Sequence, residues 1–238
     1  MWLIVYYRPV GLFSLKAGAA TSTGAKTVFL PTPFAVRTAI LDASIRTLGV
    51  ETAPDVFQIL KAVTIAALPP EHVVVTNLFT KVRKPRRPEA QSLEPMQPSI
   101  SFREYAYLKG DLGLAFQGEG AVLDRLDVLL PQINYFGKRG SFFQLVALPK
   151  RSTELPEGFV VLRGIFVNGT HLTWQAMTPC KLGLIQMLDD WGPDLTFEKL
   201  NVYTDDSIRL GRDRVRESVI LPYSLARSSR SFSYYKRM

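Results

Sequence analysis

The chain has 238 residues and little of the chemistry that many enzymes and metal proteins need. Its one cysteine, Cys180, excludes an intramolecular disulfide and a cysteine-cluster metal site, which favours a reducing, cytoplasmic setting. Its two histidines, His72 and His171, form no HExxH or other paired-histidine motif. We therefore expect no catalytic constellation, no metal site and no cofactor.

Long apolar runs and nucleotide-binding motifs are also missing. The nearly apolar stretches are too short to cross a membrane, and MWLIVYYRPVGLF lacks the basic start and the small-residue cleavage site of a signal peptide. No GxxxxGK[ST] motif is present. The acidic pairs 189–190 and 205–206, together with Asp194, have no EF-hand spacing and are expected to solvate loops. We expect no membrane partner.

Positive charge is concentrated in two segments of a chain whose formal net charge is +8. Residues 81–87, KVRKPRR, hold five cations and no acid. Residues 209–238 hold seven arginines and one lysine against Asp213 and Glu217, a net charge of +6, which leaves −3 for the rest of the chain. Basic segments on a neutral-to-acidic body indicate a polyanionic partner, most often nucleic acid, although solvated loops show the same pattern.

The first half of the chain alternates between strand and helix patterns. Residues 2–15 are rich in β-branched and aromatic residues, which predicts a strand. A helix is expected to follow, with Thr32 as its N-cap, Pro33 in its first position and Gly49 at its end. The other predicted elements are a helical piece over 54–62, strands between 63 and 81, and an amphipathic helix over 119–130.

A basic, proline-rich insertion interrupts the strands. Residues 85–99 contain four prolines and cannot form a regular central strand or helix. We expect residues 81–98 to form a projecting hairpin tip or a loop inserted between two strands. The segments SISFREYAYLKG and GLAFQG then predict a further β-pair around Gly110 and Asp111.

The predicted elements up to residue 149 follow the order β, α, β, insertion, β, α, β. This is the order of the ferredoxin-like, RRM-type fold, in which two helices cover one face of a sheet. Beyond this point, Asn168-Gly169 between two β-rich runs predicts a hairpin with a type I′ turn. We therefore predict an α+β fold, with a palm over 1–149, a basic thumb insertion at 78–104 and a mainly β C-terminal lobe over 150–238.

A second basic motif, INYFGKRGSFFQL, follows the predicted second helix and places two cations between two glycines. The glycines permit close approach of an RNA backbone. The flanking Phe142 or Phe143 could stack on bases, but burial of these rings in the core is the better expectation. Since Ser141 stands where the RRM pattern requires an aromatic residue, an ordinary base-stacking RRM is not expected.

Three motifs, taken in order, resemble those of one family. FLPTPFAVRTAI resembles the opening of the first helix in the Cas-five family, which are RAMP-superfamily subunits of type I CRISPR Cascade complexes. INYFGKRGSFF is similar to the family's segment after the second helix, and PPEHVVVTNLFTKVRKPRR is similar to the start of its β-hairpin thumb. The resemblance covers residues 1 to about 150 and extends only loosely over the C-terminal lobe.

The resemblance implies an RNA-binding subunit of a type I Cascade, with transposon-associated Cascades included, that holds the 5′ handle of the CRISPR RNA. Its implied partners are this RNA, backbone-type RAMP subunits and the large subunit, with target DNA reached only indirectly. The residues implied to bind RNA are Arg37 in the first helix, Lys81, Arg83, Lys84, Arg86 and Arg87 in the thumb, and Tyr135, Lys138 and Arg139 in the palm. Charge alone adds Arg227 and Arg230 as RNA or partner contacts.

Two alternatives stay open. Some members of the family cut precursor RNA without a metal ion, using Tyr, Lys and His for proton transfer. A metal-independent endoribonuclease that depends on His72 or His171 is therefore the enzyme alternative. The other alternative is a basic scaffold protein whose arginine-rich tail binds acidic protein surfaces.

Overall fold

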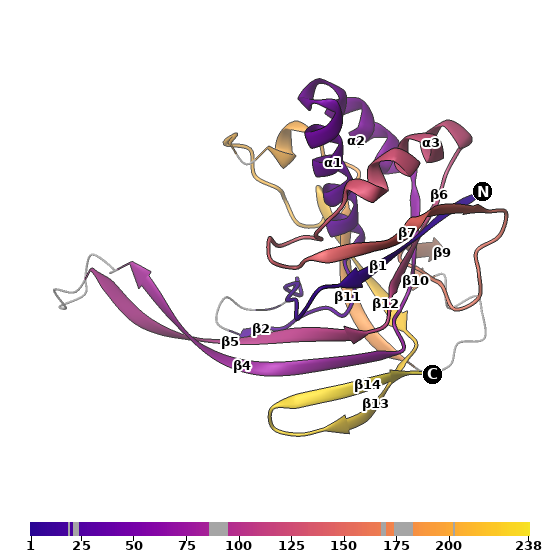
Figure 1. Ribbon diagram of the computed structural model, residues 1–238. Helices are drawn as coiled ribbons and strands as arrows, with labels where there is room; N and C mark the ends of the chain where they lie inside the picture. Colours follow the sequence, from indigo (N-terminus) through magenta and orange to yellow (C-terminus); the bar gives the residue numbers. More distant parts are fainter. Residues whose placement is uncertain (19, 21–23, 86–94, 168–169, 174–182, 202) are drawn as a thin grey trace.

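The chain folds as a mixed α+β structure in which strands outnumber helices (Figure 1). The computed structural model describes residues 1–18, 20, 24–85, 95–167, 170–173, 183–201 and 203–238. Two five-stranded sheets form the body, and the helices gather on one side of the first sheet (Figure 1). The predicted α+β class is confirmed.

The first sheet is antiparallel between all of its neighbouring strands. Its order is β7-β1-β6-β3-β8. The strands are β1 (Trp2–Pro9), β3 (Thr64–Leu68), β6 (Leu112–Gln117), β7 (Phe143–Ser152) and β8 (Val160–Val161). Strand β1 therefore lies between β7 and β6, although both are far away in the sequence.

The helix α1 (Pro33–Leu48) begins and ends where the sequence predicts. The Thr32 hydroxyl oxygen accepts a hydrogen bond from the Ala35 N–H at 3.2 Å, and Gly49 follows the last turn. Two further α-helices in the described part of the chain are α2 (Ala53–Ala62) and α3 (Gly120–Leu129), and they too match the predicted segments. Within the described ranges, no helix has the length and apolar character needed to cross a membrane.

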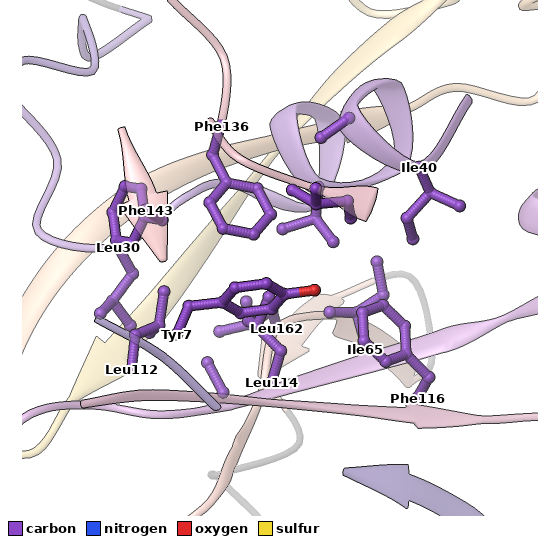
Figure 2. Packing of buried hydrophobic residues seen from close by; sticks show 14 of the residues in the cluster. Tyr7, Leu30, Ile40, Ile65, Leu112, Leu114, Phe116, Phe136, Phe143 and Leu162 are labelled. Atoms are coloured by element: carbon purple, nitrogen blue, oxygen red, sulfur yellow. The ribbon is translucent and has the colours of Figure 1, made fainter. Parts of the chain in front are cut away.

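Tyr7 lies at the centre of the core between the helices and the first sheet (Figure 2). Its hydroxyl donates a hydrogen bond to the Leu130 carbonyl oxygen at 2.7 Å, and burial raises the pKa of this phenol above its ordinary value. The Phe136 ring meets the Tyr7 ring edge-on at 5.2 Å, and Phe143 packs against Phe136 in turn. This aromatic cluster joins β1 and β7 to the segment that follows α3.

The second sheet has the order β13-β14-β4-β5-β2. Strands β4 (His72–Pro85) and β5 (Met96–Lys109) pair without a break in register from His72 opposite Lys109 to Pro85 opposite Met96. Their far ends project from the body as a two-stranded arm, which we call the β4–β5 ribbon (Figure 1). The other strands are β2 (Gly24–Ala25), β13 (Tyr223–Ser228) and β14 (Phe232–Arg237).

Two details of the predicted strands are wrong. Strand β5 pairs with β4 whereas β6 pairs with β1 and β3, so the expected β-pair around Gly110 and Asp111 does not form. The chain instead passes from one sheet to the other at Gly110. The ribbon also runs further into the proline-rich segment than expected, because Pro85 and Pro98 are tolerated where, among the described residues, each strand has one hydrogen-bonded neighbour.

The C-terminal part of the chain is mainly β and packs into the same core. Strands β9 (Gly164–Val167) and β10 (Thr170–Thr173) pair as the predicted hairpin requires, while its Asn-Gly turn lies outside the described residues. Strands β11 (Leu184–Trp191) and β12 (Arg214–Leu221) form a second antiparallel pair. The division into a palm and a C-terminal lobe stays a prediction.

A buried ion pair joins α1 to β11. The Arg37 guanidinium donates from Nε to Asp190 Oδ1 at 2.7 Å and from Nη2 to Oδ2 at 3.1 Å. The same guanidinium donates to the Leu60 carbonyl at the end of α2 and, at 3.0 Å, to the Val63 carbonyl before β3. Arg37 is 5% exposed and Asp190 is 8% exposed, so both charges are satisfied inside the protein.

We predict that Arg37→Ala lowers the free energy of unfolding by about 3–5 kcal/mol, because it leaves the Asp190 carboxylate buried without its partner. Chemical denaturation measures the change. Arg46→Ala is the matched control, since Arg46 lies in the same helix in an exposed i,i+4 pair with Asp42 and should cost less than about 1 kcal/mol. Equal losses in the two variants would contradict the structural role of Arg37.

Candidate nucleic-acid interface

The β4–β5 ribbon carries the basic residues of the predicted thumb on both of its faces. Alternation along β4 places Lys81 and Arg83 on one face and Lys84 on the other. All three side chains are exposed. Arg86 and Arg87 lie outside the described residues.

Aromatic side chains share a ribbon face with Lys81 and Arg83. Phe79 and Phe102 lie directly opposite each other, with ring centroids 5.0 Å apart and planes at 76°. Phe79 is 53% exposed and Phe102 is 58% exposed, although these are large apolar rings. Exposed rings beside cations are the combination with which proteins bind single-stranded nucleic acid.

The GKRG turn (Gly137–Gly140) is fixed from behind by two buried rings, those of Phe136 and Phe143. The Ser141 N–H donates to the Lys138 carbonyl at 3.0 Å and closes the turn. Gly137 has a φ of +67°, and a Cβ there would meet the Leu15 side chain at 3.0 Å, so this position requires glycine. The motif is therefore a rigid turn with an exposed basic tip.

The sequence left open which phenylalanine enters the core. Phe143 is 2% exposed and packs in the aromatic cluster, whereas Phe142 is 53% exposed. Backbone pairing of Tyr135 with Phe142 brings these two rings to the base of the GKRG turn. Tyr135 is partly buried, while Lys138 and Arg139 are exposed.

A cleft of about 660 Å³ opens where the GKRG turn meets the start of α1 and the base of the ribbon. We call it the α1 cleft. Its walls include the N-cap Thr32, Ala35 of α1, Gly137 of the turn and Asp189 of β11. Cations from four separate segments line it: Lys16, Arg103, Lys138 and Arg214.

The charge balance of the α1 cleft is positive. Its lining includes one carboxylate, Asp189, and this group is already ion-paired with the Arg214 guanidinium. The same guanidinium lies 4.4 Å from the centre of the Phe34 ring, which holds its plane in place. The first turn of α1 carries no acidic residue, so the positive end of the helix dipole adds to the field.

The structure brings together only some of the sequence-predicted site residues. Lys138 enters the α1 cleft, and Arg139 lies exposed beside it on the GKRG turn. Arg227 and Arg230 are exposed on β13 and on the turn between β13 and β14. They are not among the residues that line the α1 cleft.

Arg37 does not face the α1 cleft. Its guanidinium is enclosed by Asp190 and by the carbonyl groups of α2 and its following residue, so it is a structural residue and not an accessible phosphate contact. It lines a different cleft of about 550 Å³, together with Lys61, Arg163 and Glu217. Burial and the Asp190 carboxylate raise the pKa of Glu217 to about 7, and the opposing effect of Arg163 and Arg37 is smaller.

The acidic pair 189–190 does not solvate a loop as expected. Both residues lie on β11, are buried and are ion-paired. Because neighbouring strand residues point to opposite faces, Asp190 holds Arg37 on one side and Asp189 holds Arg214 on the other. Among the described residues, no group of three or more His, Cys, Asp or Glu side chains is placed to hold a metal ion.

Each histidine lies on a strand. His72 Nδ1 is 2.9 Å from the Tyr234 hydroxyl, and His72 Nε2 is 3.3 Å from the Glu71 carboxylate. His171 lies in β10, opposite Phe166 in the backbone register. The structure therefore gives His72 a tyrosine partner that the sequence did not reveal.

Sequence reasoning missed three of the four cleft cations: Lys16, Arg103 and Arg214. The three lie in separate segments of the chain, and only the fold brings them together. Arg214 does belong to the basic C-terminal segment, so its charge was counted although its place was not foreseen. The alternation of Arg214 with Arg216 along a β-rich run was the available signal.

Comparison with known proteins gives one curated relative, and no family model matches the chain. The relative is the CRISPR-associated protein Cas5 of Archaeoglobus fulgidus, which is 28% identical over 137 residues, 57% of this chain. These residues span 56% of the relative, so the match covers little more than half of its length. The resemblance drawn from the motifs is confirmed by this similarity.

Two solved structures show weaker likeness. A chain in the cryo-EM structure of the type III-B Cmr-beta complex bound to cognate target RNA has a TM-score of 0.42 and 13% identity, over 63% of this chain and 59% of its own length. The crystal structure of a CRISPR protein from Archaeoglobus fulgidus has a TM-score of 0.41 and 13% identity, over 100% of this chain and 92% of its own length.

We predict that the stability of the protein falls as the pH rises from about 4.5 to about 7 because of Glu217. The pKa of this group is raised from 4.5 to about 7 on folding, so in this interval the folded chain binds more protons than the unfolded chain. Above about pH 7 this contribution is constant.

Urea titrations of the wild type and Glu217→Gln across this interval measure the effect. The neutral variant should gain stability relative to the wild type as the pH rises, with the gain complete near pH 7. Glu154→Gln on the exposed surface should give parallel curves. A constant difference between Glu217→Gln and the wild type would show that Glu217 titrates normally.

Proposed function

We propose that this Cas5-like chain is an RNA-binding subunit of a CRISPR effector complex and that it holds the 5′ handle of the CRISPR RNA. The similarity to a curated Cas5 protein supports membership of such a complex. The observation that carries RNA binding is the α1 cleft, where four cations from separate segments face the start of a helix. The single-stranded handle would gain most of its affinity there from neutralised phosphates.

The arrangement of strands supports a ferredoxin-like palm with a thumb. The strands β1, β3, β6 and β7 lie side by side in the order β7-β1-β6-β3. In the sequence, helices connect β1 to β3 and β6 to β7, as in the ferredoxin-like fold. The β4–β5 ribbon is inserted between β3 and β6 and would be the thumb. Its base contributes Arg103 to the α1 cleft, so palm and thumb would grip the RNA together.

We propose a type I Cascade, transposon-associated forms included, as the setting. Backbone-type RAMP subunits and the large subunit would dock beside the chain, target DNA would be reached through them, and the complex would act in the cytoplasm. Lys138 and Arg214 would contact the handle within the α1 cleft, and the exposed Lys81, Arg83 and Lys84 would follow its phosphates along the ribbon. Arg86 and Arg87 extend this basic run in the sequence.

We predict that the triple substitution of Lys81, Arg83 and Lys84 by Ala weakens binding of a repeat-derived handle RNA on the order of tenfold at moderate salt. Each lost phosphate contact removes about 0.7 from the slope of log K against log salt, so the slope should become shallower by about 2. Fluorescence anisotropy over a salt series measures both quantities.

The matched control replaces three exposed cations that lie off the ribbon and off the α1 cleft: Arg125, Lys150 and Arg212. It removes the same charge and should leave the slope unchanged. Equal effects of the two triple variants would show that RNA affinity depends on the net charge of the protein and not on the position of these cations. Absence of any RNA shift in the wild type would favour the alternative of a basic scaffold for acidic proteins.

One observation, the contact of His72 with Tyr234, favours the alternative of a metal-independent endoribonuclease. Imidazole and phenol groups at 2.9 Å can exchange a proton, and Lys109 and Lys236 lie opposite His72 on the neighbouring strands. These are the residue types that a metal-independent endoribonuclease uses on a 2′-hydroxyl. Proton transfer at His72 is thus a second candidate function.

Incubation of the purified chain with repeat RNA in EDTA tests this alternative. Cleavage at one site, lost in His72→Ala and retained in Glu71→Gln, would establish it. We predict no specific cleavage, because handle binding in the α1 cleft requires no proton transfer. RNA integrity on a denaturing gel is the measurement, with handle affinity as the control for folding.

A further inference from the structure

The second sheet has an outer face that the proposed handle site reaches only at Arg103, two residues along β5 from Tyr105. Val73 and Val75 of β4, with Ala106 and Leu108 of β5, point inward and are buried in the core. The residues between them therefore point outward. The register places three outward rows across β14, β4 and β5, which together we call the outer face: Phe232–Thr76–Tyr105, Tyr234–Val74–Tyr107 and Lys236–His72–Lys109.

The first two rows each hold two aromatic rings around a smaller central residue. In one row Tyr234 and Tyr107 stand on either side of Val74, and in the other Phe232 and Tyr105 stand on either side of Thr76. Tyr107 is 47% exposed, and the other three rings are partly buried. Rows along a strand repeat every ~7 Å, a spacing that lets successive unstacked bases meet successive rings.

The outer face is also positively charged. Lys236 and Lys109 close one end of the array, and Arg227 of β13 lies opposite Tyr234 at its side. All three cations are exposed. None of the nine positions in the three rows is acidic, although the Glu71 carboxylate lies beside His72 at the margin.

We propose that the outer face binds a single-stranded nucleic acid, with bases stacked on Tyr107, Tyr105 and Tyr234 and phosphates held by Lys109, Lys236 and Arg227. Rings that are exposed or partly exposed, cations at the edge and an antiparallel sheet are the parts of a sequence-tolerant stacking platform. This inference goes beyond handle binding, since none of these residues lines the α1 cleft.

An acidic protein partner fits these observations less well. Cross-strand aromatic pairs by themselves stabilise a sheet, but such stabilisation does not require cations around the array. A protein interface would favour an apolar patch without charge at its edge, whereas here the row of Tyr234 and Tyr107 adjoins the row of Lys236, His72 and Lys109. The array of rings and cations is complementary to a strand of bases and phosphates.

The test uses the full chain, first saturated with handle RNA so that the α1 cleft is filled. Labelled oligouridylate and oligothymidylate of about 12 nucleotides are then titrated at several salt concentrations. We expect both probes to bind this complex. Tighter binding of the first would identify RNA as the preferred strand, and tighter binding of the second would identify DNA.

Tyr107→Ala should lower the affinity for the short probes about tenfold. Tyr107→Phe should keep the wild-type affinity, because the stacking ring remains. Handle affinity should be unchanged in both variants. Tyr203→Ala is the matched control, since this tyrosine is 94% exposed and does not belong to the second sheet. Lys109→Ala with Lys236→Ala should flatten the salt dependence of the short probes by about 1.4 in slope.

Four results would overturn the proposal. The saturated complex could fail to bind either probe, or Tyr203→Ala could weaken the probes as much as Tyr107→Ala. Tyr107→Ala could weaken handle binding instead, which would place the handle on the outer face. Loss of an acidic protein partner in Tyr107→Ala, with probe binding unchanged, would assign the face to protein. If the triple substitution of Lys81, Arg83 and Lys84 left the affinity for handle RNA unchanged, that result would count against the proposed function and not against binding at the outer face.

Discussion

The buried pair of Arg37 and Asp190 is the constraint on which the rest of the polar architecture depends. The Arg37 guanidinium of α1 donates hydrogen bonds to a carboxylate of β11 and to the backbone carbonyls of Leu60 and Val63. It therefore fixes the positions of the end of α2, the start of β3 and β11 relative to α1. A buried charge tolerates few arrangements of its partners. With β11 fixed in this way, the preceding residue, Asp189, is turned to the opposite side, where it holds Arg214 at the α1 cleft.

Local chemistry made much of the fold predictable from the sequence. The cap at Thr32, the proline after it and the glycine at the end of α1 act within a few residues of each other, and the structure has all three where expected. The β5–β6 pairing was wrong because partner choice is a property of whole sheets. Likewise, the acids at 189–190 appeared to be loop residues because the partner of Asp190, Arg37, lies 153 positions away.

The candidate site was predictable in its exposed tips and not in its walls. The basic tip of the GKRG turn follows from the sequence, because glycines favour a turn and the charged side chains between them favour exposure to solvent. The α1 cleft does not, since its other cations come from three segments that only the fold brings together. For Arg37 a warning was present: it shares the buried helical stripe of Ile40, Leu41 and Ser44, at spacings of three, four and seven residues.

The unbroken register of the β4–β5 ribbon has a mechanical consequence. On one edge the ribbon is supported by β14 as far as Thr76 and by the bond from Asn77 N–H to the Ser231 carbonyl, and on the other edge by β2 as far as Phe102. Past these points, among the described residues, each ribbon strand pairs only with the other ribbon strand. We expect a load near the far end of the ribbon to bend it at Leu78 and Ser101, where the described support ends. The ribbon beyond this line would then move as one unit, with the aromatic pair of Phe79 and Phe102 at its base.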